Sequence, residues 1–165
     1  MRHRIFIAIN LPEDIKKELS SFENKWPELP VRWTKKDNLH ITLEFLGYLS
    51  DEEVSKTCQE TKELAAKHKP FTVTLNRICY GPPDKIPPYM VWAMGEKIRE
   101  LDLSPHITLG RIKTWEWRRL EPEERPEIEE EINLSFEVNS IEVMESQLKR
   151  GGSSYSILES CLFQN

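Results

Sequence analysis

The chain has few cysteines and no long apolar run, and both scarcities narrow its class. Its three cysteines, Cys58, Cys79 and Cys161, are scattered without a Cys-x-x-Cys pair, which argues against a disulfide framework or a zinc knuckle. No apolar run approaches the roughly 20 residues that a membrane-spanning helix needs, and the N-terminus lacks the organisation of a secretory signal. We therefore expect a cytoplasmic protein that does not enter a membrane.

Positive charge is also in short supply. The 165 residues hold 23 Lys and Arg against 28 Asp and Glu, which gives a net charge of −5 and a pI of about 5.5. This balance argues against a broad, non-specific nucleic-acid surface, although it leaves room for a small basic pocket. The length suffices for one ordinary domain with a sizeable core.

Histidine is rare, yet two of the four histidines occupy the same tetrapeptide. His-Ile-Thr-Leu occurs at residues 40–43 and again at residues 106–109. Ile-Thr-Leu should follow a given histidine on the order of once in a few thousand cases, so chance explains the repeat poorly. The plain alternative is a pair of ordinary strands whose histidines happen to lie on the surface.

Strand geometry gives the repeat a chemical meaning. Alternate residues of an extended strand project from the same face, so His40 shares a face with Thr42, and His106 shares one with Thr108. The isoleucine and leucine of each motif would then face a buried interior. An imidazole titrates near neutral pH, and a threonine hydroxyl can donate a hydrogen bond to an oxyanion. Two such pairs facing one cleft would supply an acid, a base and two donors around a tetrahedral anion.

The rest of the sequence predicts an α+β fold. Residues 5–9 are typical of a buried strand, and apolar residues at three- and four-residue intervals over residues 11–26 predict a helix. Ser50 and Glu53 form a capping box for a second helix that ends near residue 68, with Val54, Leu64 and Ala65 on its inner face. After a segment at 31–47 that carries the first motif, strands are predicted at 71–75, 89–94, 105–112, 136–144 and 155–163, with loops at 81–88 and 114–131. The simplest arrangement is a bilobal duplicated β-α-β unit with two largely antiparallel sheets around a central cleft.

These residues resemble the two-histidine phosphoesterase superfamily, and within it the RNA 2′,3′-cyclic phosphodiesterases historically called 2′-5′ RNA ligases. The resemblance rests on five stretches: RIFIAINLPEDIKKEL, VRWTKKDNLHITLEFLGYLSDEE, MVWAMGE, SPHITLGRIK and IEVMESQLKRGGSSYSIL. It implies a bilobal α+β domain over residues 1–165 in which both motifs line a central cleft.

The resemblance also implies an activity. The chain is expected to hydrolyse a 2′,3′-cyclic phosphate at an RNA 3′ end to a 2′-phosphomonoester, with no metal and no other cofactor. By analogy His40 is the acid at the leaving O3′, His106 is the base on water, and Thr42 and Thr108 assist; the opposite assignment of the histidines stays open. The reverse reaction would give minor 2′-5′ ligation. The expected partners are RNA 3′ ends or oligonucleotides that bear the cyclic phosphate, and we expect a monomer.

Four further residues are candidate substrate contacts. Arg111 lies where relatives have a phosphate-contacting arginine, but strict alternation puts it on the face opposite the motif histidine, so it reaches the cleft only if the strand ends or bulges near Gly110. Trp115 and Trp117 lie beside two arginines and could stack on a base, and Trp33 is a candidate for the cleft border. Packing of these rings in the interior is the competing interpretation.

Other functions make different demands. A metal-dependent hydrolase or deaminase would need further ligands at fixed spacing, and neither motif offers His-Glu-x-x-His or a cysteine pair. A non-catalytic RNA- or nucleotide-binding module is expected to lose a motif histidine or threonine, and all four are present. Within the enzyme interpretation, a small cyclic nucleotide or a 2′-5′ oligonucleotide is the alternative substrate.

One segment departs from the resemblance. Relatives place a full helix and a loop between the MVWAM stretch and the second motif, whereas this chain has only residues 95–103 there. A strand crossover normally needs a dozen or more residues. Either the helix of the second lobe has been trimmed, or residues between 94 and 104 are absent and the numbering has been closed over a gap.

Overall fold

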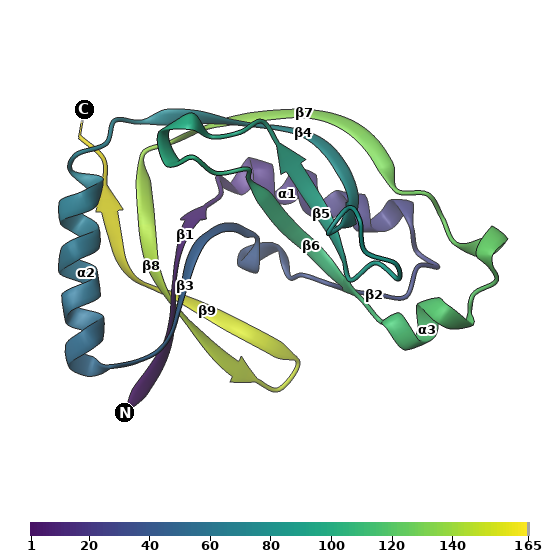
Figure 1. Cartoon of the computed structure of the whole chain (residues 1–165), viewed down its shortest axis with the longest axis horizontal. Coiled ribbons are helices and arrows are strands. Elements are labelled where there is room, and N and C mark those ends of the chain that lie inside the picture. The colour runs from purple at the N-terminus through teal and green to yellow at the C-terminus, as the bar shows by residue number, and fades with distance from the viewer. Residues whose placement is uncertain (165) are drawn as a thin grey trace.

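The computed structural model describes residues 1–164, which form nine strands and three helices (Figure 1). In chain order these are β1 (Arg2–Asn10), α1 (Glu13–Ser21), β2 (Val31–Trp33), β3 (His40–Ser50), α2 (Asp51–Ala65), β4 (Phe71–Gly81), β5 (Met90–Gly95), β6 (His106–Ile112), α3 (Thr114–Arg119), β7 (Glu129–Val138), β8 (Ser140–Lys149) and β9 (Gly152–Leu162). The strand order is β7-β4-β5-β6-β3-β1-β8-β9, with β2 beside β6, and every pair is antiparallel. The predicted α+β fold with largely antiparallel pairing is confirmed.

The two expected sheets are the two halves of one sheet. Within residues 1–164, β3 and β6 share one paired position, Ile41 with Ile107. These isoleucines, the second residues of the two motifs, are 1% and 0% exposed. The strands that carry the motifs therefore meet at the motifs and diverge on either side, which brings the two histidines to the junction of the halves.

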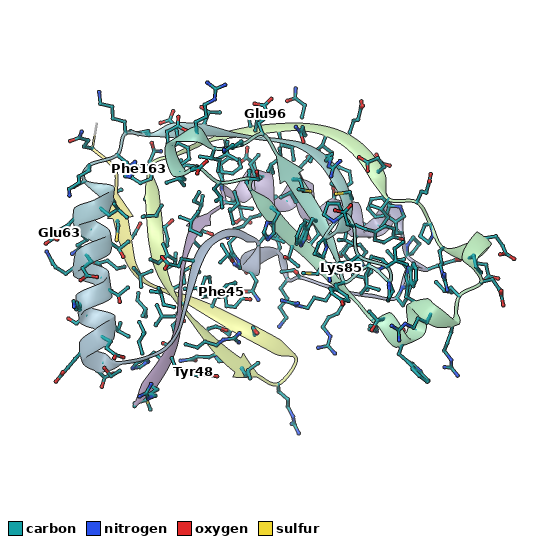
Figure 2. The ribbon with its side chains drawn as sticks, in the orientation of Figure 1. Phe45, Tyr48, Glu63, Lys85, Glu96 and Phe163 are labelled. Atoms are coloured by element: carbon teal, nitrogen blue, oxygen red, sulfur yellow. The ribbon has the colours of Figure 1, made fainter. Side chains whose placement is uncertain are left out.

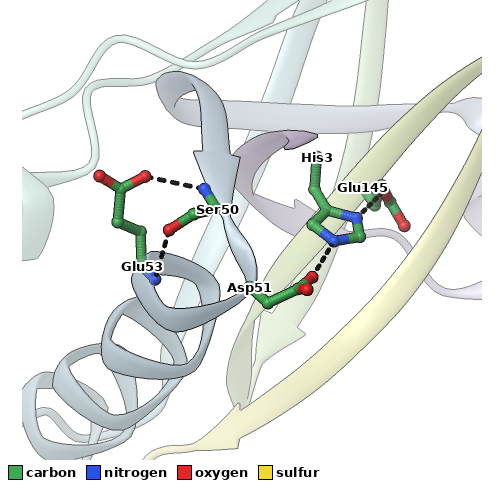
Figure 3. Close-up of polar contacts among 5 residues, drawn as sticks. All are labelled: His3, Ser50, Asp51, Glu53 and Glu145. Carbon is green, nitrogen blue, oxygen red and sulfur yellow. Dashed lines mark hydrogen bonds and ion pairs between the residues drawn. The ribbon is translucent and has the colours of Figure 1, made fainter. Parts of the chain in front are cut away.

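Helix α2 follows from the capping box at its first turn. Ser50 Oγ accepts a hydrogen bond from the Glu53 N–H, and the Glu53 carboxylate accepts one from the Ser50 N–H, as predicted (Figure 3). The helix packs against β1, β3, β8 and β9, and Glu63 projects away from the sheet (Figure 2). Ala65 is buried, but Leu64 is 52% exposed, so its predicted place on the inner face was wrong.

Several predicted boundaries differ from the observed ones. The first helix ends at Ser21, and a short 3-10 turn, Phe22–Lys25, carries its apolar spacing onward. The strand predicted at 136–144 is two strands, because Asn139 separates β7, which pairs with β4, from β8, which pairs with β1. The expected loop at 114–131 holds α3, and its last three residues begin β7.

The short connection into the second motif is a hairpin. Because β5 and β6 are antiparallel neighbours, they need no crossover, and the assumption that one was required was wrong. The Ile98 N–H donates to the Leu103 carbonyl at 2.7 Å, and the Leu103 N–H donates back at 3.1 Å. The backbone groups that face each other across this turn are thereby satisfied within a few residues.

Candidate active site

The two motifs share a β-bulge as well as a sequence. The pairing of β3 with β1 skips Leu43, and the pairing of β6 with β5 skips Leu109, the last residue of each motif. An extra residue in one strand moves the following side chains to the other face. The fifth residue after each histidine, Phe45 in β3 and Arg111 in β6, therefore joins the face of the histidine and the threonine. The bulge required to bring Arg111 to the face of His106 is therefore present, at Leu109.

These side chains surround a pocket at the junction of the two halves. Its lining comprises the motif residues His40, Thr42, His106 and Thr108, the fifth-position residues Phe45 and Arg111, and Arg4, Phe6, Thr34, Asn38, Ser146, Ser153 and Tyr155. The structure thus brings five of the eight residues singled out in the sequence into one concave site. The pocket thus contains two imidazoles, two hydroxyls and a guanidinium. This set suits a reaction at an anionic group in which one proton is removed and another is supplied.

The orientation of His40 is set by its own strand. Its Nδ1 lies 2.7 Å from the Asn38 carbonyl oxygen, which can only accept, so Nδ1 carries a proton and donates it. Nε2 lies 2.8 Å from Thr42 Oγ1, at the pocket. The rings of Phe6 and Tyr155 lie 5.1 and 5.2 Å from the imidazole, centre to centre. Burial lowers the pKa of His40, and the hydrogen bond to Asn38 partly opposes this shift.

His106 is held by an aromatic ring in the adjacent strand. It stacks on Trp92 of β5, with ring centres 4.1 Å apart and planes 22° apart. The indole in turn packs on Gly81, where an added Cβ would lie 2.2 Å from the indole ring. Burial lowers the pKa of His106, whereas an indole face favours the imidazolium form. Trp92 carries no signal of this role in the sequence, because only the register of β5 against β6 brings it to His106.

The two histidines influence each other electrostatically. After burial and the charge of Lys16, a charge on His106 also lowers the pKa of His40, so protonation of one imidazole disfavours protonation of the other. Because burial lowers the pKa of both histidines from the ordinary 6.5, both rings are mainly neutral at neutral pH. A neutral imidazole carries one N–H donor and one acceptor nitrogen, so either ring can give or take a proton.

The three tryptophans predicted to contact substrate lie outside the pocket lining. Trp33 packs on the core next to Gly110, where an added Cβ would come within 3.1 Å of its ring. Trp117 is 8% exposed, and the Arg125 guanidinium lies over its ring, with Cζ 4.1 Å from the ring centre of Trp117. Trp115 is exposed on the other side of α3. Strand β6 ends at residue 112, and α3 carries the last two rings away from the site.

Other lining residues were not foreseen, and their signals differ in strength. Arg4 and Phe6 alternate with Ile5 in the first strand, so their shared face was visible in the sequence. Phe45 needed the bulge, which no alternation pattern announces. Tyr155 needed the pairing of β8 with β9, and Asn38 Nδ2 ties that hairpin to the site by donating to the Ser153 carbonyl at 2.9 Å.

Among residues 1–164, no group of three or more His, Cys, Asp or Glu side chains is placed to hold a metal ion. Over the same residues, no helix has the length and apolar character needed to cross a bilayer.

His3 lies away from the pocket, between two carboxylates (Figure 3). Its Nε2 lies 2.5 Å from Asp51 Oδ1 and its Nδ1 lies 2.6 Å from Glu145 Oε2. The hydrogen bond to Asp51, followed by that to Glu145, raises the pKa of His3 because both stabilise the imidazolium. The contacts link β1 to the start of α2 and to β8, so His3 serves stability.

We expect this contribution to depend on pH. A histidine whose pKa rises on folding stabilises the protein fully below its ordinary pKa of 6.5, and the effect is lost as pH rises through the raised value. The pKa of Asp51 is lowered, so its share is lost in acid below the ordinary 3.8. The gap in free energy of unfolding between wild type and His3→Gln, measured in urea, should therefore shrink as pH rises above 6.5. In an Asp51→Asn, Glu145→Gln background the trend should vanish, and a pH-independent gap in the wild-type background would contradict the assignment.

Comparison with known proteins gives the chain a family. The family described as LigT like Phosphoesterase matches residues 9–92, which include the first motif. An RNA 2′,3′-cyclic phosphodiesterase of Methanocaldococcus jannaschii is 26% identical over 176 residues, covering 94% of this chain and 98% of that protein. A Thermotoga maritima protein of the same name is 26% identical over 186 residues, covering 98% of this chain and 96% of that protein.

Solved structures share the whole fold. A Thermus thermophilus protein has a TM-score of 0.79 at 26% identity, with 97% of each chain covered. LigT of E. coli in complex with 3′-AMP has a TM-score of 0.77 at 25% identity, with 100% of each chain covered. The family match spans half of the sequence, and the longer alignments extend past the second motif. The chain belongs to the LigT-like phosphoesterases, the two-histidine family that its doubled motif resembles.

Proposed function

We propose that this chain hydrolyses RNA 2′,3′-cyclic phosphates to 2′-phosphomonoesters, with His40 and His106 as the acid–base pair. The observation that carries the proposal is the convergence of both His-x-Thr pairs and Arg111 on one pocket. The names of the Methanocaldococcus and Thermotoga relatives support the substrate, and the 3′-AMP complex of E. coli LigT supports binding of a nucleotide.

The chemistry follows from the positions of the groups on two strands. Hydrolysis brings water to phosphorus on one side while the P–O3′ bond breaks on the other, so the base and the acid must face each other across the phosphate. In our assignment His106 takes the proton from water, and Nε2 of protonated His40 gives one to O3′. The phosphate then stays on O2′. The threonine hydroxyls and Arg111 stabilise the negative charge that grows on the phosphate oxygens.

The same groups account for the remaining features of the proposal. Arg111 supplies the positive charge that a metal ion would otherwise bring to the phosphate, so we propose a metal-independent reaction. A 5′-hydroxyl in the place of water would yield a 2′-5′ linkage, which we propose as a minor reverse activity. The continuous sheet across both halves supports a single domain over residues 1–165.

Incubation with an oligonucleotide that ends in a 2′,3′-cyclic phosphate, in the presence of EDTA, tests the proposal. The expected product carries its phosphate on O2′, because the P–O3′ bond is the one that breaks. The phosphate position can be read by phosphorus NMR or by the response of the product to a phosphatase that removes only 3′-phosphates. Loss of turnover on chelation would refute metal independence, and a 3′-phosphate would refute the assigned bond cleavage.

A further inference from the structure

The catalytic face of the sheet continues beyond the pocket along β1. Residues on this strand alternate: Ile5 and Ile9 lie in the main core, in the same cluster as Ala65 of α2. Arg2, Arg4 and Phe6 project from the opposite face, which α2 does not cover. Phe6 and Arg4 line the pocket, and Arg2 lies two residues further along β1, outside the pocket lining.

A second bulge in β3 extends this face with aromatic rings. The pairing with β1 skips Leu46 as well as Leu43, so Phe45 lies opposite Phe6 and Tyr48 lies opposite Arg4. Side chains directly opposite in an antiparallel pair share a face. Strict alternation would have put Glu44 on the side of His40, and the bulges put two aromatic residues there instead.

Both rings are open to solvent. Phe45 is 70% exposed and Tyr48 is 62% exposed, and they follow each other along β3 (Figure 2). Large exposed aromatic residues that adjoin one another on a sheet are typical of a binding surface. From His40 to Tyr48 the strand rises by about 20 Å, which leaves room for several nucleotides of an extended chain.

The charges on this face are positive. Arg2 and Arg4 are both exposed, and Arg2 Nη1 donates to the Tyr48 carbonyl at 3.3 Å. Within residues 1–164 neither arginine forms an ion pair with a carboxylate. Across from Arg4 on β8 lies Ser146, which is followed on β9 by Tyr155, so the neighbouring positions are neutral. In a chain of net charge −5, this local excess of positive charge favours a polyanion.

We propose that Phe45, Tyr48, Arg2 and Arg4 bind the nucleotides that precede the cyclic phosphate, so the preferred substrate is single-stranded RNA several nucleotides long. The proposal rests on the proposed function, because it places the cyclic end beside His40 and His106. Bases stack on aromatic rings irrespective of sequence, and arginines beside them contact the phosphates. Continuity with the pocket and the alternation of rings with guanidinium groups favour RNA over a protein partner.

A comparison of two substrates tests the inference separately from the function. Wild-type kcat/KM is measured for a cyclic mononucleotide and for a single-stranded oligonucleotide with the same 3′ nucleotide. Each stacked base is expected to favour the oligonucleotide by about tenfold or more. Equal values for the two substrates would overturn the inference while leaving the function intact. Hydrolysis of neither would remove the function, and the inference with it.

Variants of Tyr48 identify the stacking surface. Tyr48→Ala should lower the ratio of oligonucleotide to mononucleotide kcat/KM by about tenfold, whereas Tyr48→Trp, which keeps a flat ring, should preserve it. Tyr48→Leu separates stacking from apolar contact and should behave like the alanine variant. Leu64→Ala, on the exposed side of α2, is the matched control and should keep the wild-type ratio. An unchanged ratio in Tyr48→Ala would contradict the proposal.

The arginines can be tested through salt dependence. Binding of the oligonucleotide to a His106→Ala variant is measured at several salt concentrations, with and without Arg2→Gln. Loss of one phosphate contact should lower affinity and reduce the slope of log affinity against log salt by about 1. An unchanged slope would show that Arg2 contacts no phosphate and would remove it from the surface.

Discussion

Replacing either His40 or His106 by alanine is expected to lower kcat for a 2′,3′-cyclic phosphate by on the order of a hundredfold or more. The reason is that each variant lacks either the general acid or the general base. KM should change less than kcat, since Arg111 and the hydroxyls still hold the phosphate. Initial rates over a range of substrate concentrations separate the two effects. A variant with near-normal turnover would take its histidine out of the mechanism.

His68→Ala is the control for this experiment, because His68 lies beside Phe163, with ring centres 6.1 Å apart, and neither residue lines the pocket. The roles of the two histidines can be separated with a substrate in which sulfur replaces the bridging O3′. A thiol is far more acidic than an alcohol, so the thiolate leaves without a proton donor. The variant that lacks the acid should recover activity on this substrate, and the variant that lacks the base should not. In our assignment the recovery belongs to His40→Ala.

The second large effect is expected at the contact between the two halves of the sheet. Ile41→Ala and Ile107→Ala should each lower the free energy of unfolding by about 2–5 kcal/mol, because each removes a fully buried side chain. Unfolding in urea, followed by tryptophan fluorescence, measures the loss. The conservative Ile→Val changes serve as controls and should cost about 0.5–1.5 kcal/mol.

These two positions should also matter for activity. Ile41 and Ile107 are the paired position between β3 and β6, so they set how far apart His40 and His106 lie. A catalytic group displaced by about 1 Å can cost on the order of a hundredfold in rate. If both alanine variants kept wild-type stability, the single contact would not be the joint between the halves.

Local patterns predicted much of the fold because they reflect local forces. The capping box over residues 50–53 marked the start of α2, and the spacing of His, Ile, Thr and Leu assigned the buried and the open faces of β3 and β6. The four motif residues could be assigned to one site because the repeat made their environments equivalent.

Features that depend on pairing between distant strands could not be read from the sequence. Trp92 meets His106 through the register of β5, and Tyr155 meets His40 through the pairing of β9 with β8. Bulges have no alternation signature: strict alternation would place Glu44 on the face of His40, whereas the bulge at Leu43 turns it to the other face. Trp115 and Trp117 were predicted to stack on a base, but β6 ends at residue 112 and both rings lie on α3, outside the pocket lining.

The repeated bulge makes the active site adjustable at one position in each half. Because an extra residue follows each threonine, three residues of each strand line the pocket: the histidine, the threonine, and the fifth residue after the histidine. The histidine and the threonine are identical in both halves, whereas the fifth residue after the histidine is Phe45 in one half and Arg111 in the other. One half thus presents a ring to the pocket and the other presents a charge. Exchange of this residue would alter the chemistry of the pocket while both histidines stay in place.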